Sequence, residues 1–391
     1  MIEGETAHRR APVLGRLRPQ VKAYAWGSHT VLAQLTGRPA PTDEPEAELW
    51  MGAHEAAPSG IGDLTLDQLV ARDPEHALGP RVARHFDGRF PFLLKILAPQ
   101  TALSIQAHPD AEQALDAAPG TYVDQWPKPE ALLAVTSFEI FAGLRPYDDI
   151  RRIVRQLGVT SLAQLLDAVS SRENPVATLL TDILRAERGL QQRLVQEVVA
   201  ACGARLTGPD AQSFDAVLRV AEQFPGDIGL VVLLLMVHRV LEPGDYIFVP
   251  PGVLHAYVHG TCVELLANSD NIVRAGLTPK PLNIDELLRI VDSDRAMLPE
   301  RPTSGRIHSF PAEVPHFQLH VVEPDPEPVT LPAADRPRIA LALHGPVTLA
   351  CGDARFELAP GESFFLGASD GGATVCGTGT LYLATSGLAN S

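Results

Sequence analysis

Apolar and polar positions change their spacing twice along the chain. Up to about residue 100, short apolar runs alternate with Gly and Pro turns, as in RFPFLLKILAP (89–99), which predicts a β-rich region with some helix around 65–86. From about residue 145, apolar residues recur three and four positions apart, first in DDIRRIVRQLGV (148–159) and then in four further segments. This pattern predicts a helical block over 145–238 that is inserted into a β-rich chain.

The sequence pattern is again typical of β-strands after the helical block. The segment LEPGDYIFVPPGVLHAYVHG (241–260) reads as strands, a Pro- and charge-rich connection lies near 294–306, and 307–391 alternates apolar and polar runs between Gly and Pro turns. The longest apolar run, IGLVVLLLMV (228–237), is too short to span a bilayer and predicts a buried helix instead.

One motif occurs twice. LEPGDYIFVPPG (241–252) and LAPGESFFLGAS (358–369) both place Leu-x-Pro-Gly before an acidic residue and an apolar run. Pro-Gly favours a turn and the apolar run favours a strand, so the repeat predicts two related β-barrels. Only the first copy continues into a histidine, and only that barrel is a candidate for chemistry.

The charge balance is strongly acidic, with 32 Lys and Arg against 47 Asp and Glu, a formal charge of −15. Nucleic acid and anionic membranes are therefore disfavoured as partners, and an anionic substrate would need a locally basic pocket. Cys202, Cys262, Cys351 and Cys376 are far apart without a CxxC pair, which favours reduced thiols. Because the N-terminal segment also has no apolar signal-peptide region, we expect a cytoplasmic location.

The spacing G-x5-P-x-G-x2-H occurs once, formed by Gly244, Pro250, Gly252 and His255. It is similar to the second sequence signature of the cupin superfamily, whose jelly-roll barrels hold a metal on inward-facing strand residues. Taken alone, the segment is equally compatible with a buried histidine beside a turn.

A second segment supplies further candidate ligands. SIQAHPD (104–110) places Gln106 and His108 two residues apart, hence on the same face of a strand. In cupins the first signature supplies His-x-His and then Glu; here Gln106-Ala-His108 takes that place, and the next suitable carboxylate is Glu130. With His255 these residues offer two imidazoles, one carboxylate and one amide oxygen, a set that suits zinc, with Mn²⁺ or Fe²⁺ as alternatives.

Several motifs, in this order, are similar to those of the type I phosphomannose isomerases. They are YAWGS (24–28), AELWMGAH (47–54), LLKILA (93–98), LSIQAHPD (103–110), KPE (128–130) and PPGVLHAYVHGTCVELLANSDNIVRAGLTPK (250–280). The resemblance covers essentially the whole chain, although Pro251 and His259 depart from the family pattern beside His255. It implies an enzyme with one Zn²⁺ per chain that interconverts mannose 6-phosphate and fructose 6-phosphate through a cis-enediol.

The resemblance also implies the architecture: mainly β with an α-helical insert, as two cupin-like jelly-roll barrels plus a helical domain. We expect a discontinuous catalytic cupin over 1–144 and 239–300, the helical domain over 145–238, and a degenerate C-terminal jelly roll over 307–391. The expected partner is a phosphorylated hexose substrate, without nucleic acid or membrane. The chain is expected to be a monomer or a weak homo-oligomer.

Residue roles follow from the same resemblance. The implied zinc ligands are Gln106, His108, Glu130 and His255, and Arg274 falls on the family's catalytic arginine. Three residues are alternatives for the general base, and the sequence does not choose among them: Glu264, Asp270 and Lys128. Three others are expected to contact the substrate: Ser104, Lys95 and Lys280.

The other histidines are expected to have structural roles, and the roles of two tryptophans are left open. His54 is expected to pack in a loop, and His259 is expected not to bind metal. The C-terminal histidines lack acidic partners at ligand spacing and are expected to be structural: His308, His316, His320 and His344. Trp26 and Trp50 fit either the sugar pocket or the core.

Two alternative functions come from other classes: an Fe²⁺-dependent cupin oxygenase and a non-catalytic sugar-binding cupin. The amide at Gln106 and the lack of a compact His-x-His-x₃₋₄-Glu argue against the first. The presence of Arg274 together with all four ligands argues against the second.

Overall fold

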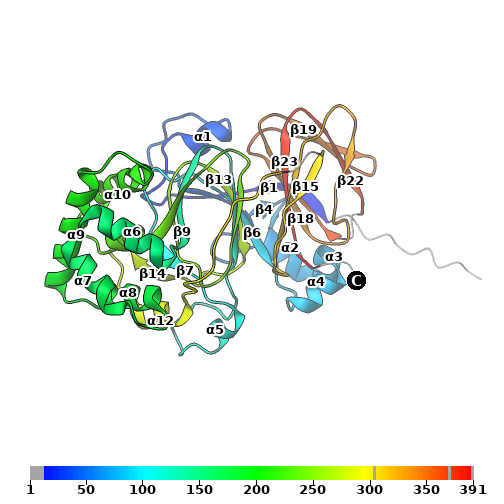
Figure 1. Cartoon of the computed structure of the whole chain (residues 1–391). Helices are drawn as coiled ribbons and strands as arrows, with labels where there is room; N and C mark the ends of the chain where they lie inside the picture. The colour runs from blue at the N-terminus through cyan, green and yellow to red at the C-terminus, as the bar shows by residue number, and fades with distance from the viewer. Residues whose placement is uncertain (1–12, 303–304, 369–370, 389–391) are drawn as a thin grey trace, which may run out of the picture.

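The computed structural model describes residues 13–302, 305–368 and 371–388. Its strands form four sheets that pack as two pairs, and a block of helices covers one end of the molecule (Figure 1). The fold is therefore mainly β with helices, as the sequence predicts.

The first pair of sheets lies next to the helical block. Its six-stranded sheet has the order β11 (Tyr246–Val249), β8 (Glu130–Ala134), β13 (Cys262–Ala267), β6 (Phe92–Leu97), β3 (Glu48–Gly52), β2 (Gln20–Lys22). Its five-stranded sheet has the order β10 (Met236–Leu241), β9 (Phe138–Leu144), β12 (His255–His259), β7 (Ile105–Ala107), β14 (Val273–Gly276).

The second pair contains the C-terminal strands. Its eight-stranded sheet has the order β15 (Ile307–Ser309), β16 (Gln318–Val322), β23 (Thr380–Thr385), β18 (Arg338–Leu343), β21 (Ser363–Leu366), β1 (Leu14–Arg18), β4 (Gly60–Ile61), β5 (Leu64–Thr65). Its four-stranded sheet has the order β17 (Val329–Thr330), β22 (Ala373–Gly377), β19 (Val347–Cys351), β20 (Ala354–Leu358). β1 pairs with β21, so N-terminal strands complete a C-terminal sheet. Within the described ranges, none of the four sheets closes on itself.

The predicted helices are present, but they end at Leu235 instead of at 238, because β10 begins at Met236. The helical block consists of α6 (Tyr147–Leu157), α7 (Thr160–Val169), α8 (Pro175–Leu184), α9 (Arg188–Gly203), α10 (Ala211–Gln223) and α11 (Gly229–Leu235). Every residue of α11 is buried, as its apolar run predicts, and the chain passes directly from it into β10. Among the described residues, no helix is both long and apolar enough to cross a membrane.

The remaining helices are short and lie between strands. They are α1 (Val31–Leu35), α2 (Leu66–Arg72), α3 (Pro74–Leu78), α4 (Pro80–His85), α5 (Ala111–Leu115) and α12 (Ile284–Ile290). Three of them, α2 to α4, account for the helix predicted around 65–86.

The alternation of side chains along each strand sets the layers. In the five-stranded sheet, Phe141 and Ala256 pack against the helical block, whereas the next residues, Ala142 and Tyr257, face the six-stranded sheet. The helices therefore close the outer face of this sheet. The inner face of the five-stranded sheet lines the space between the two sheets of the first pair.

The repeated Leu-x-Pro-Gly motif forms the same turn in both pairs. Gly244 and Gly361 have φ angles of 89° and 83°, a region that glycine enters without steric cost. Each turn leads into a buried strand, β11 in the first pair and β21 in the second. The strands predicted from the repeat are thus present in both places.

Candidate active site

Three strands bring the predicted metal ligands together on the inner face of the first pair. Gln106 lies on β7 and His108 directly follows it, Glu130 begins β8, and His255 begins β12 opposite Gln106. One ligand atom each from His108, Glu130 and His255 lies within 4.8 Å of the others. All four side chains are buried. The grouping predicted from three separate segments is therefore present.

Both imidazoles are fixed in one tautomer by backbone carbonyls. His108 Nδ1 lies 2.7 Å from the carbonyl oxygen of Asn271, and His255 Nδ1 lies 3.0 Å from that of Val253. A carbonyl only accepts, so each Nδ1 carries the hydrogen and each Nε2 keeps a lone pair. This is the arrangement in which histidine binds a metal through Nε2.

Those lone pairs are directed at the carboxylate of Glu130. His108 Nε2 lies 3.1 Å from Oε1, and His255 Nε2 lies 3.4 Å from Oε2. Within the described residues, His108 Nε2 has no hydrogen-bond partner. Burial, together with the Lys128 ammonium, lowers the pKa of His108 to about 4, so no proton links it to the carboxylate at neutral pH. A lone pair that faces a carboxylate is unfavourable, and a cation bound between the two groups would relieve this repulsion.

The fourth ligand completes a set that fits zinc. The Nε2 atom of Gln106 lies 3.2 Å from His255 Nε2. Turning the amide over would place its oxygen at that position, since the amide oxygen and nitrogen are nearly equal in size. Two imidazoles, a carboxylate and an amide oxygen are suitable zinc donors. The residues present therefore fit the implied metal.

A cleft of about 570 Å³ opens beside these ligands. Its wall includes every other predicted site residue: Lys95, Ser104, Lys128, Glu264, Asp270, Arg274 and Lys280. Trp26 and Trp50 also line it, and both pack against apolar clusters as well. Nine of the eleven predicted site residues therefore line one cavity, and the other two, His108 and His255, lie next to Glu130 in its wall.

Arg274 and Lys280 leave positive charge available in this cleft. Arg274 lies on β14 opposite Gln106, and in the described part of the chain no carboxylate lies within 4 Å of its guanidinium. Partial burial lowers its pKa, but an arginine remains charged at neutral pH. Lys280 is exposed at the rim. The cleft can therefore attract an anion although the chain as a whole is acidic.

A buried charge cluster crosses three strands of the six-stranded sheet. Lys95 Nζ lies 3.5 Å from Glu48 and 3.3 Å from Glu264. Burial alone would lower the pKa of Lys95, but the two carboxylates raise it. Burial raises the pKa of Glu264 to about 7. The Lys95 ammonium opposes this rise only in part, because one ammonium cannot neutralise both carboxylates.

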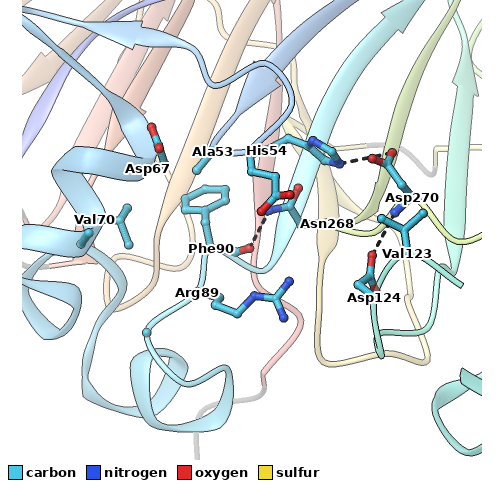
Figure 2. A pocket seen from close by; sticks show the side chains of 13 residues that line it. Ala53, His54, Asp67, Val70, Arg89, Phe90, Val123, Asp124, Asn268 and Asp270 are labelled. Atoms are coloured by element: carbon cyan, nitrogen blue, oxygen red, sulfur yellow. Dashed lines mark hydrogen bonds and ion pairs between the residues drawn. The ribbon is translucent and has the colours of Figure 1, made fainter. Parts of the chain in front are cut away.

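Asp270 forms part of the wall between this cleft and a second cavity of about 400 Å³ (Figure 2). Its Oδ1 lies 3.4 Å from Nε2 of the buried His54, and the hydrogen bond from His54 lowers the pKa of Asp270. His54 thus contacts a site residue, whereas the sequence favours a packing role for it over an approach to the pocket.

A loop at 121–126 holds the segment that carries Asp270. The Asp124 carboxylate accepts hydrogen bonds from the Ser269 hydroxyl, the Asp270 backbone N–H and the Asn271 amide. The Asn271 amide oxygen in turn accepts from the backbone N–H of Val123, at 2.9 Å. Since the Asn271 carbonyl orients His108, this loop positions a predicted metal ligand and Asp270 together.

Sequence reasoning missed some of these residues. Tyr257 donates to Glu130 Oε2 at 3.2 Å, and Glu48 pairs with Lys95. Tyr257 follows His255 by two positions and Glu48 precedes Trp50 by two, so strand alternation would have put each on the cleft side. Asp124 lies in an irregular loop, where no periodicity could have indicated its role.

The remaining histidines lie apart from the metal ligands. His259 is exposed at the end of β12. His316 packs against Phe86 and Trp126, and His320 lies 2.6 Å from the Ser309 hydroxyl. No candidate metal cluster within the described ranges includes any of them.

Known proteins resemble the chain over nearly its whole length. Residues 14–147 match the family model of the phosphomannose isomerase type I catalytic domain. The mannose-6-phosphate isomerase of Escherichia coli (strain K12) is 31% identical over 390 residues, covering 94% of this chain and 98% of that protein. The Bos taurus protein of the same name is 33% identical over 403 residues, covering 90% and 92%. A solved mannose 6-phosphate isomerase bound with zinc and yttrium has a TM-score of 0.87 at 31% identity, covering 96% of this chain and 100% of that one.

Proposed function

The chain belongs to the type I phosphomannose isomerases, and on that premise we propose that its cleft interconverts mannose 6-phosphate and fructose 6-phosphate through a cis-enediol. The observation that carries the proposal is the convergence of His108, Glu130 and His255 beside a cleft that also contains Arg274. Aldose–ketose isomerisation needs an electrophile, a base and a grip on the phosphate, and residues suited to each line this one cavity.

We propose Gln106, His108, Glu130 and His255 as the ligands of one zinc ion. Zinc bound there would supply a Lewis acid that polarises the carbonyl and hydroxyl oxygens of the sugar. The hydrogen bonds that the imidazoles donate to the carbonyls of Asn271 and Val253 fix the rings, and the Tyr257 hydroxyl fixes Glu130, so the ligands need little reorganisation on binding.

Arg274 and two lysines are proposed to hold the anionic substrate. Arg274 can form two parallel hydrogen bonds to a phosphate or an enediolate, because its guanidinium has no carboxylate partner among the described residues. Lys280 at the rim adds a second positive charge, and Lys95 is assigned to the sugar end of the cleft. Ser104, next to β7, is assigned a hydrogen bond to a sugar hydroxyl.

Glu264 is the general base that the electrostatics favour over Asp270 and Lys128. A base works best when its pKa lies near the working pH, and burial raises the pKa of Glu264 to about 7. Asp270 has a lowered pKa and is a weaker base. Lys128 lies 3.3 Å from Glu130, so its ammonium is engaged by a proposed zinc ligand.

The activity is tested by removing and restoring the metal. EDTA treatment should abolish the conversion of mannose 6-phosphate to fructose 6-phosphate in a coupled assay, and stoichiometric zinc should restore it. Unchanged turnover in enzyme shown to be metal-free by elemental analysis would contradict the zinc assignment. Zinc-loaded, folded enzyme without any turnover would contradict the activity itself.

We further propose that each pair of sheets is a cupin-like jelly roll. The first would comprise 1–144 and 239–300, with a helical domain at 145–238, and the second 307–391. The apolar clusters between the sheets of each pair support this division, while β1, β4 and β5 join the second pair from the N-terminal segment.

For the setting of the enzyme, we propose a cytoplasmic monomer or weak homo-oligomer. Cys202 and Cys262 are buried free thiols, as expected in a reducing compartment. The large apolar residues that are exposed in the described part are scattered over separate elements: Val21, Tyr24, Leu115, Val123, Leu206, Val240 and Leu298. A strong dimer would need a continuous apolar patch.

A further inference from the structure

A third cavity lies where the helical block meets the first pair of sheets. It has a volume of about 550 Å³ and is enclosed by the end of β9, the starts of α6 and α8, strand β10 and the segment 293–297. This volume is in the range of cavities that hold small-molecule ligands. None of the residues assigned to catalysis or zinc binding lines it.

Two arginines in its wall have only neutral partners. Arg145 donates to the Ser213 hydroxyl at 3.2 Å, and Arg239 donates to the Met297 carbonyl at 3.3 Å. Within the described ranges, no carboxylate lies within 4 Å of either guanidinium, and the buried Nε of each has no hydrogen-bond partner. The protein itself therefore leaves both positive charges uncompensated at close range.

Several other arginines of this region are paired with carboxylates, whereas the exposed Arg155, Arg172 and Arg193 have no carboxylate within 4 Å in the described part. Arg152 contacts Asp210, Arg219 contacts Glu139 and Arg295 contacts Glu313. In a chain with a formal charge of −15, carboxylates are plentiful enough to pair every arginine. Unlike those exposed arginines, Arg145 and Arg239 are partly buried and share one cavity, which points to an external anion as their partner.

Electrostatics agree with this interpretation. Burial lowers the pKa of Arg145, Asp210 and Asp149 partly oppose this, and the positive charges of Arg152 and Arg239 act in the same direction as burial. Holding two like charges together in a half-buried wall costs free energy. An anion that accepts hydrogen bonds from both would offset this cost, and phosphate oxygens match guanidinium geometry well.

The other residues of the cavity wall favour a ligand in which a phosphoryl group is attached to a small organic molecule. The first turns of α6 and α8 both lie at the cavity, and helix N-termini are positive. Asp149, Glu173 and Asp294 also line it, but Asp149 is already paired with Arg152 at 3.7 Å. The cavity is larger than a bare ion needs, and Tyr147 offers a ring against which a sugar or base could pack.

We propose that this cavity binds a small phosphorylated metabolite, with its phosphoryl group held by Arg145 and Arg239. The site is separate from the proposed isomerase cleft and does not rest on that activity. It lies close to the metal ligands, because Ala142 in its wall pairs with His255 across β9 and β12.

The test measures inorganic phosphate binding to the zinc-loaded enzyme by calorimetry. Wild type should bind two phosphates, one in the cleft and one in this cavity. The double variant Arg145→Met/Arg239→Met should lose one event, with affinity there falling about tenfold or more, since hydrogen bonds to charged groups are worth about 1.5–3 kcal/mol. Arg274→Met should weaken only the other event. Arg193→Met, which removes an exposed arginine of α9, is the matched control and should change neither.

A structural measurement keeps the test decisive if the double variant folds poorly. Crystals of the wild-type enzyme soaked in tungstate, a phosphate mimic, should show anomalous density between Arg145 and Arg239. Density in the cleft alone, or equal phosphate binding by wild type and a folded double variant, would overturn the proposal. Isomerase turnover of the double variant, measured separately, shows whether the cleft is intact.

Discussion

The two pairs of sheets share a turn motif but have different interiors. Between the sheets of the first pair lie two imidazoles, an amide and a carboxylate, with Lys95 and Glu264 farther along. Between those of the second pair lies a large apolar cluster, and the buried Arg338 and Thr385 lie at the ends of two of its strands. The cluster includes Val322, Ala340, Ala342, Val347, Leu349, Leu358, Phe364, Leu366, Val375, Leu381 and Leu383. One layered arrangement therefore supports a reactive interior in one place and a hydrocarbon core in the other.

The difference has an energetic meaning. Buried ionisable groups cost free energy unless they are paired, whereas a buried large apolar side chain contributes about 1.5–3 kcal/mol. The first interior is therefore a poor source of stability. It is tolerated because apolar packing on the outer faces of its sheets, against the helical block and against the second pair, holds it in place. Substitutions in the first interior should mainly change activity, and those in the second should mainly change stability.

The largest effect is expected for Glu130→Gln. Removing the only carboxylate among the predicted ligands should release the zinc and reduce turnover by at least about 10³-fold, because the metal supplies several kcal/mol of transition-state stabilisation. Elemental analysis and the coupled assay measure both losses. Glu357→Gln, at an exposed position on β20 of the second pair, is the control and should lose neither. A zinc-loaded, active Glu130→Gln enzyme would contradict the ligand set.

The opposite behaviour is expected for Phe364→Ala in the second interior. Phe364 is 1% exposed, and its truncation should lower the free energy of unfolding by about 3–5 kcal/mol. Zinc content and kcat of the protein that remains folded should not change. Chemical denaturation and single-temperature kinetics separate the two quantities, and a large loss of kcat in folded enzyme would show that the two interiors are not independent.

Arg274→Met should separate catalysis from metal binding within the first pair. Losing the unpaired guanidinium should reduce kcat/KM by about 10²–10³-fold, the effect typical of one electrostatic group at a reaction centre. Zinc content should stay at one ion per chain. Arg274→Lys, which keeps the charge but not the two-pronged geometry, should recover only part of the loss. Near-normal turnover of Arg274→Met would remove Arg274 from the mechanism.

Asp124→Ala tests the loop that supports the first interior from outside. Loss of its hydrogen bonds to Ser269, Asp270 and Asn271 should loosen the carbonyl that orients His108. Zinc affinity or turnover should fall about 10–100-fold, as is usual for residues that position metal ligands. Competition with a zinc chelator measures the affinity. Unchanged affinity and turnover would show that the loop does not position the site.

The smallest effect is expected at His320, a buried histidine of the second pair that has no carboxylate partner among the described residues. Burial lowers the pKa of His320 to about 4, against about 6.5 in an unfolded chain. The unfolded state therefore binds a proton first, and stability should fall as the pH drops below about 6.5, by up to about 1.4 kcal/mol per pH unit until about pH 4. His320→Gln should reduce this slope in denaturation series. An identical slope would mean that His320 titrates normally.

Much of the fold could be predicted because it depends on local spacing. The helical block follows from apolar residues three and four positions apart, and the strands after Gly244 and Gly361 follow from a turn motif that recurs. The pairing of Leu14 with Leu366 could not be predicted in this way, since it joins strands at opposite ends of the chain and neither strand carries a signal for the other.

The candidate site divides in the same manner. Gln106, His108 and His255 could be identified because strand alternation and signature spacing mark them in the sequence. The hydrogen bonds of Asp124 and the contact between His54 and Asp270 depend on how loops meet in space. The proposal of Glu264 as the base also required the structure, because its deep burial raises its pKa and the sequence does not show that burial.

The central claim is that the interior of the first pair holds the zinc ion and the interior of the second pair holds none. Anomalous diffraction at the zinc edge from crystals of the zinc-loaded enzyme tests it directly. The account predicts a peak about 2.0–2.2 Å from Nε2 of His108, Nε2 of His255 and a carboxylate oxygen of Glu130, with the Gln106 amide oxygen turned towards it. A peak between the sheets of the second pair, or the lack of one beside Glu130 in fully active crystals, would contradict the account.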